Sequence, residues 1–318
     1  MSADTIRPVE EALKMAERMF RVDDVMADIG SDRVAEYYDQ SIGGYENVYH
    51  RSGAMHMALN SGDEFNAAGL LGQVRRCARA LEGEKVTRIL ELGSGGGFNL
   101  IGMAARFPEA EIVGLDLMPG HVERARRRAE ERGLSNVTVI ARSFAELDED
   151  LGEFDLIYSV EALCYATDLP DLFRKVAARL RPGGQFIVFD SFRGVPPAQL
   201  DDTMRKVLLL SEVGMAVNNG FHTVPAWRKA LDAAGLRLEA NGDYTDQIMP
   251  SLRRLYHLAA PFAGGVRKVA VKAMPPLLAR NLLTGLLGVH AHAPVPGRED
   301  GRRALCYRGI FARKPLEG

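Results

Sequence analysis

From Arg88 to Phe189 the chain alternates short apolar runs with longer stretches of helical periodicity. This alternation is typical of βαβ units, in which parallel strands form a buried sheet and the connecting helices pack against it. The pattern therefore predicts an α/β fold. With 318 residues, of which 47% are hydrophobic, the chain is long enough to bury a full core.

Seven strands can be placed along the chain, five of them in this alternating region. The expected strands are Arg88–Leu92, Ile112–Leu115, Val137–Ala141, Phe154–Ser159, Gln185–Phe189, Leu236–Ala240 and Ala304–Phe311. The expected helices are Val9–Met26, Asn66–Leu81, Phe98–Phe107, His121–Arg132, Pro170–Leu180 and Pro225–Ala234. Roughly sixty residues separate the last two strands, which is too many for a loop in a compact domain, so a helical insertion is expected there.

These elements divide the chain into five parts. Cap and lid helices are expected over residues 1–82, an α/β core over 83–193, a continuation of the core with a cap segment over 194–245, the helical insertion over 246–300 and the last core strand over 301–318. The insertion is apolar with interleaved basic residues, namely Arg253, Arg254, Arg267, Lys268, Lys272 and Arg280. We expect it to cover a hydrophobic substrate pocket, and plain core packing, peripheral membrane contact and a homo-oligomer interface are the alternatives.

Charge balance and cysteine content limit the partners and the compartment. The 40 basic and 42 acidic side chains nearly cancel, so no overall field attracts nucleic acid, and a small molecule is the expected partner. Cys77, Cys164 and Cys306 lie far apart, which argues against a disulfide framework and fits a reducing cytoplasm. His290 and His292 lack an acidic residue at metal-ligand spacing, so no metal site is expected. Without a signal-peptide pattern or an apolar run of about 18 residues, the protein is expected to be cytoplasmic.

A glycine-rich loop follows the first expected strand. Its sequence is Glu91-Leu92-Gly93-Ser94-Gly95-Gly96-Gly97, and residues without side chains let backbone N–H groups approach a ligand at a helix N-terminus. The second strand ends at Asp116, about 20 residues after the glycines, where a carboxylate can hold both hydroxyls of a ribose. A tight turn alone also explains the glycines, and the spacing fits a dinucleotide dehydrogenase as well as other ribose-binding enzymes.

Further features separate these classes, and through them the chain resembles the class I methyltransferase superfamily. Glu91 precedes the glycines, the glycine pattern is Gly-x-Gly-x-Gly, and a Leu-Arg-Pro-Gly-Gly turn precedes the fifth strand. The resemblance runs through Ile89–Asn99, Val113–Met118, Phe154–Glu161 and Leu180–Phe189. It implies a Rossmann-like seven-stranded sheet with a reversed last strand and a helical cap. It also implies S-adenosyl-L-methionine as the cofactor and S-adenosylhomocysteine as the product.

The same resemblance implies a set of cofactor-binding residues. The methionine part would contact the first strand and its loop, and the ribose and adenine would contact residues after the second and third strands. These residues are Glu91, Gly93, Ser94, Gly95, Asp116, Leu117, Met118, Ser143, Phe144 and Ser159. Ser143 stands where the family usually has an acid, and its hydroxyl can accept the same hydrogen bond from the adenine amino group.

Two further segments look like the sterol C-methyltransferases and related isoprenoid methyltransferases. They are the tyrosine-rich stretch from Tyr37 to His56 and the segment Val160–Asp168, which reads Val-Glu-Ala-Leu-Cys-Tyr-Ala-Thr-Asp. The resemblance implies carbon methylation of an isoprenoid or sterol-like alkene in lipid or natural product biosynthesis. The reaction would pass through a carbocation that anionic or π-rich groups stabilise and a base deprotonates. The candidate catalytic residues are Glu161, Tyr45, Tyr49, His50 and His56.

The match to the sterol enzymes is partial, and two other functions stay open. Val48 and Tyr49 stand where those enzymes have glycine and tryptophan, and Tyr165 stands where they have histidine. An O- or N-methyltransferase of a polar or aromatic natural product would use a base such as Glu161 to deprotonate its substrate. A cofactor-binding module without catalysis is the other alternative, and the intact acidic residues of the motifs argue against it.

Overall fold

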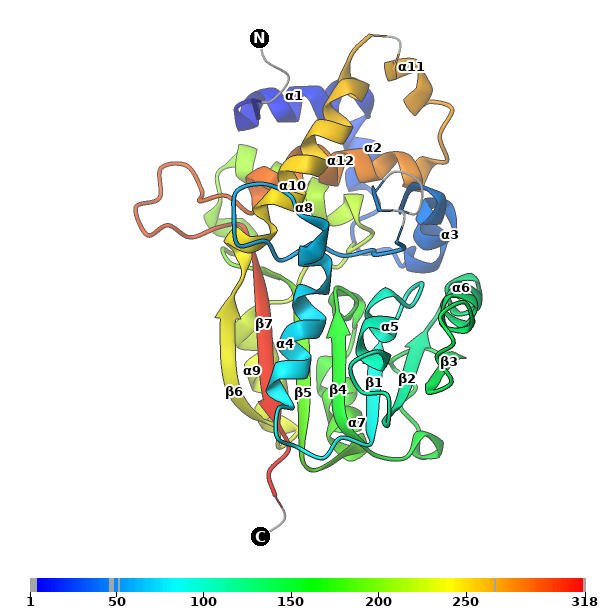
Figure 1. The fold of residues 1–318 in the computed structure, drawn as a ribbon. Helices are drawn as coiled ribbons and strands as arrows, with labels where there is room; N and C mark the ends of the chain where they lie inside the picture. Colours follow the sequence, from blue (N-terminus) through cyan, green and yellow to red (C-terminus); the bar gives the residue numbers. More distant parts are fainter. Residues whose placement is uncertain (1–4, 46–48, 51, 266, 317–318) are drawn as a thin grey trace.

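The computed structural model describes residues 5–45, 49–50, 52–265 and 267–316. Within them, seven strands form one sheet in the order β3–β2–β1–β4–β5–β7–β6 (Figure 1). The strands are β1 (Arg88–Leu92), β2 (Glu111–Asp116), β3 (Val137–Ala141), β4 (Phe154–Val160), β5 (Leu180–Arg193), β6 (Arg237–Asp243) and β7 (Leu305–Arg313). β1 to β5 pair in parallel, whereas β7 runs antiparallel to both β5 and β6. The expected Rossmann-like sheet with a reversed last strand is confirmed.

Helices cover both faces of the sheet, because successive strand residues point to opposite sides and both sides are apolar. Ile89 of β1 belongs to one buried cluster and Leu90 to another. Helices α4 (Gly72–Ala80), α5 (Phe98–Ala104) and α6 (Pro119–Glu130) contribute to the first cluster. Helices α7 (Leu169–Arg179) and α9 (Val224–Ala233) contribute to the second. The core therefore consists of two apolar layers with the sheet between them.

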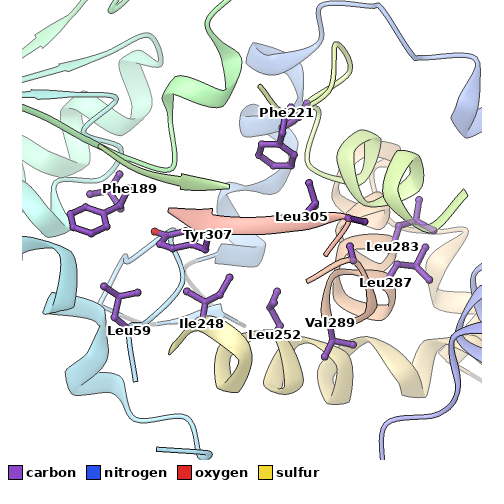
Figure 2. Packing of buried hydrophobic residues seen from close by; sticks show 14 of the residues in the cluster. Leu59, Phe189, Phe221, Ile248, Leu252, Leu283, Leu287, Val289, Leu305 and Tyr307 are labelled. Atoms are coloured by element: carbon purple, nitrogen blue, oxygen red, sulfur yellow. The ribbon is translucent and has the colours of Figure 1, made fainter. Parts of the chain in front are cut away.

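The remaining α-helices form a cap beyond the carboxyl ends of the parallel strands (Figure 1). They are α1 (Val9–Met19), α2 (Val22–Met26), α3 (Val34–Gly44), α8 (Asp202–Gly214), α10 (Thr245–Ala259), α11 (Arg267–Val271) and α12 (Pro276–Ala291). α12 packs against α1, α3, α8 and α10. Figure 2 shows Leu283 and Leu287 of α12 close to Leu252 of α10 and Leu305 of β7. The apolar core of the sheet thus continues into the cap.

The cap differs from the sequence-based expectation in three places. The helix expected over Val9–Met26 is broken at Phe20, whose backbone is extended (φ −130°, ψ 149°). α2 begins after this break with Asp23 and Asp24 in its first turn, where carboxylates stabilise a helix N-terminus. The sequence predicts neither α3 nor α8. α8 is buried on more than one face, so it lacks the one-sided periodicity by which amphipathic helices are recognised.

Candidate functional site

The loop after β1 turns sharply at the carboxyl edge of the sheet. The backbone N–H groups of Gly93 and Ser94 both donate to the Leu115 carbonyl of β2, each with an N···O distance of 2.9 Å. Gly93 has φ +72°, and a Cβ atom at this position would lie 2.3 Å from the Cβ atom of Ala162. Only glycine tolerates both the positive φ and the close approach of Ala162. The backbone of this loop is therefore not covered by a side chain at the start of α5.

Asp116, the last residue of β2, ties this loop to the next one. Its Oδ2 accepts a hydrogen bond from the backbone N–H of Gly95 at 2.8 Å. Its Oδ1 accepts from the backbone N–H of Met118 at 2.9 Å and lies 3.1 Å from Nδ1 of His121. His121 is buried, and the sequence analysis did not identify it, because a single histidine in the first turn of a helix has no distinguishing pattern. The carboxylate is therefore held rigidly at the edge of the sheet.

Glu91 is a buried carboxylate at the same edge. Burial raises the pKa of Glu91 to about 8, although the neighbouring Tyr158 and Asn99 side chains oppose this shift. Its Oε2 has no hydrogen-bond partner among the residues that the structure describes. An unpaired buried carboxylate oxygen is costly. A cationic group of a ligand would remove that cost, so this position suits an ammonium group.

A first cavity of about 280 Å³ lies above these strands. Nine of the ten predicted cofactor-binding residues line it, namely Glu91, Gly93, Ser94, Gly95, Asp116, Leu117, Met118, Ser143 and Phe144. Ser159 does not line it. The Ser159 hydroxyl is buried inside the sheet and donates to the Leu92 carbonyl of β1 at 2.9 Å, so it links two strands instead. Tyr38 and Val34 of α3 close the cavity from the cap side.

A second cavity of about 240 Å³ lies between the sheet and the cap, and its lining is mostly apolar. The insertion supplies much of this lining, with Leu255, Leu258, Phe262, Met274, Leu278 and Leu282. Tyr45 and Tyr49 line it from the segment after α3. Met55, His56 and Glu161 line both cavities. The two cavities therefore adjoin one another at these three residues.

Glu161 is the acidic residue at this boundary. It follows β4 directly and has φ +52°, a left-handed conformation that is unfavourable for a residue with a side chain. Its Oε1 accepts hydrogen bonds from the backbone N–H of Met57 and from the hydroxyl of Tyr307, both at 2.8 Å. Burial raises the pKa of Glu161 to about 8, and these two hydrogen bonds act in the opposite direction. A carboxyl with this pKa can exchange a proton near neutral pH.

The other four candidate catalytic residues lie in different surroundings. The rings of Tyr45 and Tyr49 are in edge-to-face contact, with their centroids 6.3 Å apart. Both side chains are neutral near pH 7, because burial raises the pKa of Tyr45 to about 12 and that of Tyr49 further. His56 lines both cavities, but Nε2 lies 2.8 Å from the Leu70 carbonyl, and burial lowers the pKa of His56 to about 4. His50 lines neither cavity, and its Nδ1 lies 2.5 Å from Ser52 Oγ. Glu46, Asn47 and Val48 of the same motif lie outside the described residues.

Comparison with known proteins identifies the core. Residues 89–184 match the family model described as a methyltransferase domain. These residues form a methyltransferase domain. It is 32% identical over 137 residues to a methyltransferase of Penicillium fellutanum, which covers 43% of this chain and 42% of the relative. It is 29% identical over 165 residues to a sterol 24-C-methyltransferase of Aspergillus fumigatus, which covers 50% of this chain and 42% of the relative. The chain thus matches less than half the length of these curated relatives.

Solved structures share the fold of most of the chain. The [4+2]-cyclase SpnF superposes with a TM-score of 0.70 at 19% sequence identity, covering 90% of this chain and 97% of that protein. At this identity the likeness establishes the fold alone. The methyltransferase domain and its sterol-enzyme relatives support S-adenosyl-L-methionine as the cofactor and S-adenosylhomocysteine as its product.

The residues of the first cavity fit this cofactor. Among the described residues, no donor binds Oε2 of Glu91. The α-ammonium group of the methionine part would donate a hydrogen bond to it. The Asp116 carboxylate and the side-chain-free glycine loop line the same cavity, where they suit a ribose and a backbone-bound ligand. These roles of individual residues remain predictions.

Proposed function

We propose that the protein is an S-adenosyl-L-methionine-dependent methyltransferase that methylates a carbon atom of a hydrophobic isoprenoid or sterol-like alkene. The observation that supports this proposal most strongly is the position of Glu161 at the boundary of the two cavities. The first cavity suits the cofactor, and the second, largely apolar one suits the substrate. A single carboxylate can therefore face both the methyl donor and the carbon that accepts the methyl group.

The cofactor supplies an electrophilic methyl group, and its transfer to one alkene carbon leaves a positive charge on the neighbouring carbon. Tyr45 and Tyr49 present neutral aromatic rings to the second cavity, and such rings attract a cation. Ionised Glu161 adds a negative charge at the cavity boundary. It then accepts the proton that the cation loses when the double bond forms again.

The histidines are less suited to this role. His56 has a pKa of about 4 as a result of burial, so it is a weak base at neutral pH, and its ring is held by the Leu70 carbonyl. His50 lines neither cavity. We therefore assign the base to Glu161 and propose that His56 shapes the wall between the cavities.

The test of this assignment is Glu161→Gln, which keeps the shape of the side chain and removes its charge. We expect turnover to fall by about two to four orders of magnitude, with S-adenosylhomocysteine affinity unchanged in calorimetry. Glu212→Gln is the matched control, because Glu212 is also a buried carboxyl with a raised pKa but lines neither cavity. A Glu161→Gln enzyme with wild-type turnover would remove Glu161 from the mechanism, and a parallel loss of affinity would make it a cofactor ligand.

Product analysis tests the substrate class. Sterols, prenyl diphosphates and phenols are incubated with the cofactor, and mass and NMR spectra locate the new methyl group. A carbon-bound methyl on an alkene supports the proposal. Methylation of oxygen or nitrogen instead would make the protein an O- or N-methyltransferase.

Two further contacts are predicted for the insertion, one with a membrane surface and one with a second copy of the chain. No helix in the described part of the chain has the length and apolar character needed to cross a membrane. α11 exposes Val269 beside Lys268, a pairing compatible with peripheral contact at an anionic lipid surface. Sedimentation with vesicles tests this contact, and light scattering tests for a homo-oligomer.

A further inference from the structure

Two hydrogen-bond donors from distant parts of the chain meet on Glu161. The Met57 N–H comes from the loop before α4, and the Tyr307 hydroxyl comes from β7, the last strand. Both residues that supply these donors are also hydrogen-bonded to one side chain. Nε2 of Gln73 on α4 donates to the Met57 carbonyl at 2.8 Å and to the Tyr307 hydroxyl at 3.1 Å. One amide nitrogen therefore contacts both residues that hold Glu161.

The chemistry of these groups sets the direction of every hydrogen bond. The Gln73 Nε2 can only donate, so the Tyr307 oxygen accepts from it and directs its own proton toward Glu161. The Met57 N–H can also only donate. Oε1 of Glu161 therefore receives two donors, an arrangement that complements a carboxylate and not a protonated Oε1.

We propose that Gln73 and Tyr307 are positioning residues that fix the Glu161 carboxylate at the cavity boundary and favour its ionised form. This inference rests on the proposed function for its effect on turnover. Neither residue lines either cavity, so each acts through Glu161 and not on a ligand. Both are fully buried, which protects the hydrogen bonds from competition with water.

The surroundings of Tyr307 keep its hydroxyl in place. Its backbone N–H donates to the Thr245 hydroxyl at 2.9 Å, and its carbonyl accepts from the Tyr244 N–H at 2.9 Å. Figure 2 shows the ring on β7 within the buried cluster that includes Ile248 and Leu59. The strand and its packing therefore leave the ring little freedom to turn away from Glu161.

Apart from these two donors, burial and Asp190 oppose the ionisation of Glu161. Asp190 of β5 raises the pKa of Glu161, as burial does, whereas Met57 and Tyr307 lower it. Tyr45, Tyr49 and Cys164 are neutral at pH 7, since burial raises their pKa values. Because of these surroundings, losing the Tyr307 hydrogen bond should make Glu161 markedly harder to ionise.

Tyr307→Phe tests the proposal, because it removes one oxygen and keeps the ring. We expect the rising limb of the pH–turnover profile to move to higher pH by about one to two pH units. Turnover at pH 7 should therefore fall about tenfold or more and recover in alkaline buffer. Tyr256→Phe is the matched control, because it removes a phenol oxygen that accepts from the Arg7 N–H and does not bond Glu161. The control should leave the profile unchanged.

Infrared difference spectroscopy gives a readout that does not depend on activity. The carbonyl band of the protonated Glu161 carboxyl, identified by its loss in Glu161→Gln, is followed against pH in wild type and in Tyr307→Phe. The proposal requires the Tyr307→Phe band to persist to higher pH. Gln73→Met should move it in the same direction by less, and this variant decides the matter if Tyr307→Phe does not fold. An unmoved band, with turnover lowered equally at every pH, would leave these residues a purely structural role. A shifted band in an enzyme whose Glu161→Gln variant is fully active would uphold the positioning and refute only the role of Glu161 as the base in the proposed function.

Discussion

Gly93→Ala is predicted to damage both stability and activity, and the structure separates two causes. The first is the left-handed φ of +72°, which costs a residue with a side chain about 1–2 kcal/mol. The second is contact, because the new Cβ atom would lie 2.3 Å from that of Ala162. Relieving such overpacking by moving the backbone typically costs about 1–3 kcal/mol more. The free energy of unfolding should therefore fall by roughly 2–5 kcal/mol.

Two further variants isolate these causes in urea unfolding experiments. Gly133→Ala incurs only the conformational cost, because Gly133 has φ +64° and a Cβ atom there would have no atom of the described residues within 4 Å, its chain neighbours aside. Ala162→Gly removes the atom that the new Cβ of Gly93→Ala would contact. The double variant should therefore recover the unfolding free energy lost through this contact, but not the part lost through the left-handed φ. Ala162 is the neighbour of Glu161 in the chain, so relieving the contact at Ala162 should also restore the position of Glu161. The double variant should therefore recover turnover as well. Equal destabilisation by Gly93→Ala and Gly133→Ala, with no rescue by Ala162→Gly, would refute the reasoning.

Asp116→Ala should weaken S-adenosylhomocysteine binding by about ten- to a hundredfold in calorimetry, since charge-assisted hydrogen bonds to two ribose hydroxyls are lost; unchanged affinity would mean that the ribose is held elsewhere. The stability that Glu91 and Glu161 contribute to the ligand-free protein should fall as pH rises from about 5 to about 8. Burial raises the pKa values of Glu91 and Glu161 to about 8, so both carboxyls bind a proton more tightly in the folded state than in the unfolded state. In urea unfolding at a series of pH values, the free energy of unfolding of Glu161→Gln should therefore decrease less with rising pH than that of the wild type, and an equal pH dependence of the two proteins would contradict the burial argument.

The sheet could be predicted from the sequence because its signals are local. β1 and β3 occupy the expected residues, Arg88–Leu92 and Val137–Ala141, since each is a short run rich in apolar residues that can be recognised locally. β5 is longer than expected, Leu180–Arg193 instead of Gln185–Phe189, because its far end pairs with β7. That pairing joins segments far apart in the chain, and no local pattern reports it.

The same distinction applies to the site. The glycine loop and Asp116 each follow a strand directly, so a short motif locates them, and the structure places both at the first cavity. Ser159 also lies near the end of a strand, yet its hydroxyl donates a hydrogen bond from β4 to the Leu92 carbonyl of β1. His50 resembles a candidate base in sequence, but the fold leaves it outside both cavities. Residue type and strand position therefore predict proximity to the site and not the direction of the side chain.

Glu161 shows why the chemistry of such a site exceeds what a motif can reveal. A base between two cavities must be shielded from water, and shielding by itself keeps a carboxyl protonated. Two donors that the chain supplies from distant segments, Met57 from the cap and Tyr307 from the last strand, counteract this effect by lowering the pKa of Glu161. Neither has a sequence signal that distinguishes it from ordinary core residues. Because the ionisation of Glu161 depends on these distant contacts, the tuning of the base is a property of the closed fold and not of the motif that contains it.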